Sequence, residues 1–170
     1  MATAAKRVLT AKAITPDGFE RFLAAGSAVL LVAVLAALIR GQSEWHLIKP
    51  NLWVHLGTMI IALGLTPVML LRQRGDRMHR RLGTVWIAAM VLTALVSLTI
   101  RDGNRGNFSV IHILSVWTLI QVPLIVWRAR THNIPKHRSA VRGMVTGALL
   151  IAGFFTFPFD RMLGHWLFAA

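Results

Sequence analysis

The chain has 170 residues, of which 55% are hydrophobic and only 15% charged, and its mean hydropathy is +0.60. Soluble domains average about 25% charged residues, so the composition argues against a soluble enzyme or a disordered chain. The absence of cysteine excludes disulfides, thiolate metal sites and thiol catalysis. The net charge of +13 resides on basic residues that flank apolar segments, which favours membrane contact over nucleic-acid binding.

Five apolar segments have the length of a transmembrane helix, about 17–25 residues, and none contains Asp, Glu, Lys or Arg. They cover residues 22–39, 52–71, 82–100, 108–127 and 143–159. The sequence therefore predicts an all-α membrane protein with five spans in a single domain, 22–170, preceded by an N-terminal arm, 1–21. Asp76 is expected to cap the third span after Gly75 ends the second, and Thr131 or Asn133 to cap the fifth.

The basic residues outside the spans predict an orientation. The N-terminal arm and the second and fourth loops carry fourteen Lys and Arg, whereas the first and third loops and the C-terminal tail carry five. Because basic loops stay on the cytoplasmic side, we expect a cytoplasmic N-terminus and a C-terminus outside. The first span is too long for a signal peptide and no clear cleavage site follows it, so we interpret it as a signal anchor.

The second and third spans resemble the fourth and fifth. Each unit contains a His, a Pro, two Arg separated by one residue, and a His-Arg pair, in that order. These residues are His55, Pro67, Arg72, Arg74, His79 and Arg80 in one unit, and His112, Pro123, Arg128, Arg130, His137 and Arg138 in the other. We interpret residues 51–100 and 108–160 as a duplicated two-helix unit. We expect a four-helix bundle of spans two to five, with the first span packed outside it.

His55 and His112 form a first histidine pair at matched depth in this repeat. Each lies about one turn inside the outer end of its span. An ionisable residue in a span is costly and therefore points to function. Two imidazoles on related helices are suited to ligate one haem iron, and we expect haem b there. The alternatives are a non-haem metal site and two interfacial histidines bonded to water, lipid or backbone.

His79 and His137 form a second histidine pair on the cytoplasmic side, in first helical turns. A helix N-terminus disfavours a protonated imidazole, so neutral ligands at a second cofactor site fit this position. Both histidines, however, lie outside the hydrocarbon core and beside Arg, so the favoured interpretation is an interfacial basic motif that touches lipid phosphates, and the cofactor site is the alternative. The residues expected to bind anionic lipid are Arg72, Arg74, Arg80, Arg81, Arg128, Arg130 and Arg138.

The layout across residues 51–160 resembles that of transmembrane cytochrome b proteins with two haems, such as ascorbate-type cytochrome b reductases and small bacterial superoxide oxidases. In the former, alternate helices of a four-helix core supply one histidine pair per haem, which matches the alternation here. The stretches His79-Arg80-Arg81-Leu82-Gly83 and Lys136-His137-Arg138 are similar to a family of uncharacterised bacterial multi-pass membrane proteins. That similarity implies a bacterial inner membrane, with the C-terminus in the periplasm, and no established activity.

We therefore expect a b-type cytochrome-like electron-transfer protein or subunit that exchanges electrons with quinol or a periplasmic partner. One haem is favoured over two, because two haems would lie far apart for rapid electron transfer. His55 and Arg72 are 17 residues apart, about 25 Å along a helix, and His79 lies near the level of Arg72. Whether the chain is itself a membrane oxidoreductase is left open. The alternative is a structural or assembly subunit of a larger membrane complex, without haem or with a non-haem metal. A transporter is disfavoured, because both repeat units have the same orientation.

Overall fold

The computed structural model describes residues 15–101, 108–158 and 161–168, and the regular elements within these ranges are all helices. The first half contains α2 (Gly18–Arg40), the 3-10 helix η1 (Gln42–Leu47), α3 (Pro50–Leu71) and α4 (Arg77–Ser97). The second half contains α5 (Val110–Arg130), α6 (Ile134–Met144), the π-helix η3 (Val145–Ile151), α7 (Ala152–Phe154) and α8 (Met162–Phe168).

Four of the described helices, α2, α3, α4 and α5, are long and apolar enough to cross a membrane. The multi-pass class is thus confirmed, with four candidate spans instead of five. The fifth predicted span is helical, but a π-helical segment divides it into α6, η3 and α7, so no regular helix there has the required length. This helical run begins at Ile134 rather than at residue 143, because Asn133 accepts a hydrogen bond from the Lys136 N–H and Pro135 occupies the first turn.

Capping residues set two other helix starts. α2 begins at Gly18, inside the predicted N-terminal arm, because Asp17 and Glu20 form a capping box: each side chain accepts a hydrogen bond from the other's backbone N–H, at 3.0 and 3.2 Å. Asp76 caps α4 as predicted, by accepting the His79 N–H at 2.6 Å. Gly75 ends the preceding turn with a φ of +89°, a conformation that favours glycine.

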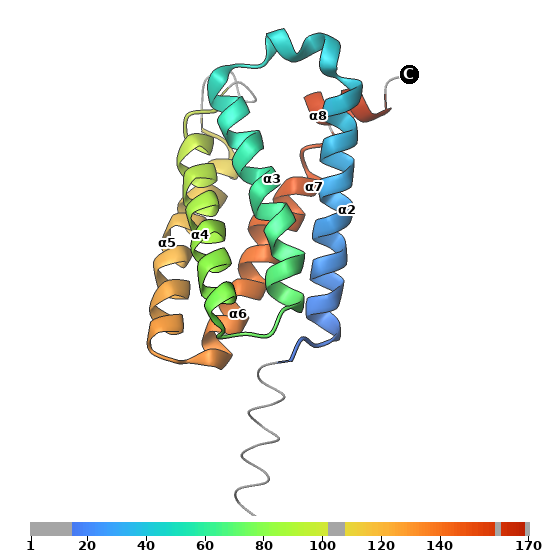
Figure 1. Ribbon diagram of the computed structural model, residues 1–170. Helices are drawn as coiled ribbons and strands as arrows, with labels where there is room; N and C mark the ends of the chain where they lie inside the picture. Colours follow the sequence, from blue (N-terminus) through green and yellow to red (C-terminus); the bar gives the residue numbers. More distant parts are fainter. Residues whose placement is uncertain (1–14, 102–107, 159–160, 169–170) are drawn as a thin grey trace, which may run out of the picture.

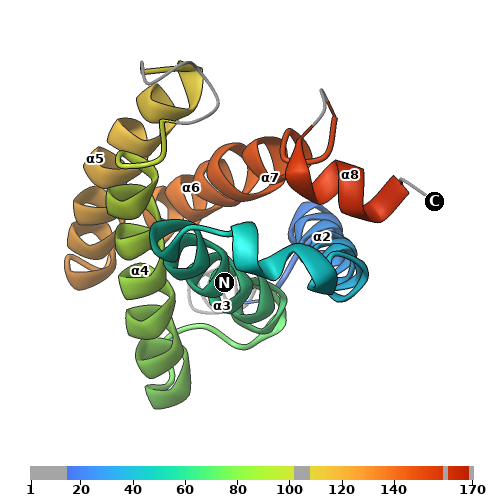
Figure 2. The same ribbon diagram turned by 90° about the horizontal axis from the view of Figure 1, so that it is seen from above.

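The long helices run roughly side by side (Figure 1). We call the end that carries the basic segments 72–81 and 128–142 the arginine-rich end, and the other the opposite end. Seen from above, α2 and α5 lie on opposite sides of the molecule, with α3 and α6–α7 between them (Figure 2). α2 flanks the bundle, as expected for the first span, but it is also part of the core, because Leu23, Leu30 and Val34 are buried.

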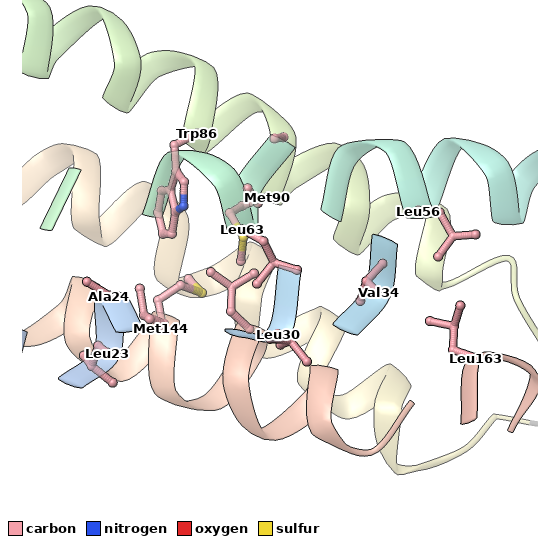
Figure 3. Packing of buried hydrophobic residues seen from close by; sticks show 14 of the residues in the cluster. Leu23, Ala24, Leu30, Val34, Leu56, Leu63, Trp86, Met90, Met144 and Leu163 are labelled. Atoms are coloured by element: carbon pink, nitrogen blue, oxygen red, sulfur yellow. The ribbon is translucent and has the colours of Figure 1, made fainter. Parts of the chain in front are cut away.

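The core lies where α2, α3, α4 and the α6–η3 segment meet (Figure 3). Leu23, Leu63, Met90, Met144 and Leu149 are among its fully buried side chains. Many large apolar side chains instead face outward, as lipid-facing residues do. Examples are Val29, Val32, Ile39, Ile113 and Ile120, each more than half exposed.

Two hydrogen bonds between side chains join α3 to α4, and a third joins the start of α3 to the turn after α4. The pairs are Asn51 with Thr99, Thr93 with Thr58, and Trp86 with Thr66, at 3.1, 2.7 and 3.0 Å. Such bonds supplement van der Waals packing, because lipid provides no hydrophobic drive for helices to associate. They hold α3 and α4 in one register, which fixes the height of each histidine on these helices.

Candidate functional site

A cavity of about 60 Å³ lies in the half of the bundle nearer the opposite end. Four segments line it: α3, α4, α5 and the stretch from η3 to just beyond α7. Nine of its fourteen lining residues are Ala, Gly, Ser or Thr, so the helix backbones themselves form much of the wall. The larger side chains that reach it from α3 and α4 are His55, Met59 and Met90.

Only one member of the first histidine pair, His55, lines this cavity. Its buried Nδ1 has no hydrogen-bond partner among the described residues. His112 is 4% exposed but is not among the lining residues. The shared depth predicted from the repeat therefore does not bring both imidazoles to one cavity wall.

The tautomer of His112 also bears on metal binding. Its Nδ1 accepts a hydrogen bond from the Ser109 backbone N–H at 2.9 Å, as the third residue of a capping box. An Nδ1 that accepts carries no proton, so in the neutral ring the proton is on Nε2. In the other neutral tautomer, the Nδ1–H donates to the Ser109 hydroxyl or carbonyl oxygen, and the buried Nε2, which has no hydrogen-bond partner among the described residues, keeps its lone pair. Haem ligation by the first pair therefore stays a prediction.

In the second histidine pair, a backbone carbonyl orients one of the two rings. The His137 Nδ1–H donates to the Ile125 carbonyl at 3.1 Å, so Nε2 keeps its lone pair. A backbone carbonyl in this role fixes both the tautomer and the ring orientation of metal-binding histidines. His79 lies close enough to His137 for the two rings to interact electrostatically, and its buried Nδ1 has no hydrogen-bond partner in the described ranges.

The surroundings of the second pair favour neutral rings. Burial lowers the pKa of His137, against the opposing effect of its hydrogen bond to Ile125, and the positive charge of Arg74 lowers it further. Arg74 also interacts with His79. A neutral imidazole is the form that binds a metal. Within the described ranges, no three His, Asp or Glu side chains are grouped as a metal site.

A buried carboxylate, Glu20, lies at the same end of the molecule. It is 1% exposed and forms ion pairs with Arg74, Arg138 and Arg142. Asp17 pairs with Arg138 and Arg142 as well. This cluster was not predicted from the sequence, because Asp17 and Glu20 fall within the predicted N-terminal arm, 1–21. The available signal was the Asp17-x-x-Glu20 spacing, which marks a helix start.

The arginines expected to bind lipid fall into two groups. Arg74 and Arg138 belong to the Glu20 cluster, and Arg72 pairs with Asp76. Arg80, which donates to the Gly75 carbonyl, Arg81 and Arg130 are exposed, and Arg128 is half-buried. Lipid contact stays a prediction for all seven, and the exposed ones are the most accessible to a headgroup.

Known proteins provide no assignment for this site. No family model, no curated protein and no solved structure matches the chain.

Proposed function

We propose that the protein carries electrons in a membrane and that His79 and His137 hold a b-type haem as its two axial ligands. The observation that carries this proposal is the hydrogen bond from His137 Nδ1 to the Ile125 carbonyl, which leaves Nε2 able to bind iron. The electrostatic interaction between the two rings supports it. We favour the second pair over the first because its two rings interact with each other, whereas His112 does not line the cavity that His55 lines.

A haem with two imidazole ligands supplies reversible one-electron transfer and has no open position for oxygen chemistry. The residues around the pair maintain its state. Ile125 orients His137, and Arg74 keeps a positive charge beside both rings, which favours their neutral forms. Glu20 holds the Arg74 guanidinium in place by an ion pair. Quinol is the proposed electron partner, in a bacterial inner membrane with the N-terminus in the cytoplasm and five spans. A periplasmic partner suits the first pair, at the opposite end, rather than this one.

The test is a reduced-minus-oxidised visible spectrum of the detergent-purified protein, with a pyridine haemochrome assay for stoichiometry. We expect a b-type spectrum at about one haem per chain, which His79→Ala or His137→Ala abolishes. His55→Ala and His112→Ala are the matched controls and should retain it. If only His55→Ala and His112→Ala lose the haem, the first pair holds it instead.

A colourless protein from a haem-replete host would contradict haem binding altogether. The hypothesis of a haem-free structural or assembly subunit would then be favoured. Co-purification of partner subunits from the native membrane would test that hypothesis.

A further inference from the structure

Three potential metal ligands line the cavity described above: the His55 imidazole and the thioethers of Met59 and Met90. His55 and Met59 are four residues apart on α3 and therefore lie on one face of that helix. Met90 comes from α4, which packs directly against α3, and is 1% exposed. The haem proposal uses none of the three.

The ligating atom of the imidazole is identifiable. The buried Nδ1 of His55 has no hydrogen-bond partner in the described part of the chain. Nδ1 is therefore the nitrogen that can bind a ligand in the cavity. None of the described lining residues carries a formal charge, and neutral donors suit an ion of low charge.

We propose that this cavity binds a single Cu(I) ion through His55 Nδ1 and the sulfur atoms of Met59 and Met90. Thioethers are soft ligands that select Cu(I), imidazole suits copper as well, and hard ions prefer the carboxylates that are missing from this lining. A cavity of about 60 Å³ is large enough for a single ion. Methionine is also an ordinary core residue, so the test must separate ligation from packing.

The test is an anaerobic titration of the purified full-length protein with Cu(I) against a chromophoric competing chelator. We expect one tightly bound Cu(I) per chain. Met59→Leu and Met90→Leu should each weaken it by at least the roughly 10–100-fold that loss of an outer-shell partner costs a metal site. Leucine has a similar volume, so these variants should fold. Met144→Leu changes a fully buried methionine outside the cavity and should leave the affinity unchanged.

X-ray absorption provides the second measurement, with sulfur scatterers expected around copper in the wild type and lost in the Met59→Leu/Met90→Leu double variant. His79→Ala/His137→Ala should remove haem and keep copper, which separates this proposal from the haem proposal. Absence of stoichiometric Cu(I), equal affinity in the double variant, or Zn²⁺ bound as tightly as Cu(I) would each overturn the site.

Discussion

Glu20 and Arg138 are 118 positions apart in the sequence, yet the Arg138 Nε donates to a Glu20 carboxylate oxygen at 2.7 Å. Arg74, from the loop between α3 and α4, binds the same carboxylate. One buried acidic group on α2 therefore joins both helix pairs of the proposed repeat. It also fixes the guanidinium that lies beside the second histidine pair.

Glu20→Gln should destabilise the protein strongly. Removing one partner of a buried ion pair leaves uncompensated charge and costs about 3–5 kcal/mol, whereas an exposed pair contributes about 0–1 kcal/mol. Asp17→Asn is the control, because the Asp17 side chain is 47% exposed although it binds the same arginines. Thermal unfolding in detergent measures both. Equal losses in the two variants would contradict the central role of Glu20.

Acid should weaken the start of α4. The Arg72 guanidinium and then the His79 N–H lower the pKa of Asp76 to about 2, from its ordinary value of 3.8. Because the folded value is the lower one, this stabilisation is present above pH 3.8 and is lost as the pH falls toward about 2. Asp76→Asn should remove that part of the acid dependence. An acid titration of helicity compares the variant with the wild type, and identical profiles would rule out the effect.

Thr93→Val should loosen α3 from α4. The change removes the hydroxyl that donates to Thr58 at 2.7 Å, and such bonds between membrane helices contribute about 0.6–2 kcal/mol. Thr84→Val is the matched control, because the Thr84 hydroxyl is exposed and bonds only the Arg80 carbonyl of its own helix. Unfolding in denaturing detergent should distinguish them. A control as destabilised as Thr93→Val would show that helix propensity, not the contact between helices, is responsible.

Gly41→Ala should displace α8 from the end of α2. A Cβ at Gly41 would clash with Cδ2 of the rigid Trp166 indole, which also donates to Glu44 at 2.9 Å. Overpacking of this kind costs about 1–3 kcal/mol. Gly143→Ala has nothing within 4 Å and should be neutral or stabilising in its helix. Thermal unfolding tests both, and an unchanged midpoint for Gly41→Ala would mean that Trp166 does not pack there.

Anionic lipid should stabilise the arginine-rich end. Arg81 and Arg130 are exposed, and a basic side chain near an anionic surface gains about 1 kcal/mol. We expect Arg81→Gln and Arg130→Gln to reduce the rise in Tm between neutral and anionic nanodiscs at low salt. Arg161→Gln, at the opposite end, is the control. If high salt leaves the difference unchanged, the contact is not electrostatic.

The sequence determined the membrane class and two of the helix caps, because apolar length and capping residues act locally. Asp76 and Asn133 were identifiable for that reason. The two histidine pairs were also visible, since a repeat preserves spacing along the chain. The spacing of residues along the chain did not predict the direction in which each side chain points from its helix. His55 faces the cavity whereas His112 bonds to its own helix cap, although both occupy the same place in the repeat.

Only the tertiary structure decided which of these residues share an environment. Glu20 meets Arg138, Met90 joins His55 at one cavity, and His137 reaches the Ile125 carbonyl because particular helices pack side by side. The hydrophobic pattern fixes which segments enter the membrane, but lipid is as apolar as leucine and does not select their neighbours. Buried ion pairs, hydrogen bonds between helices and the shapes of the facing side chains make that selection.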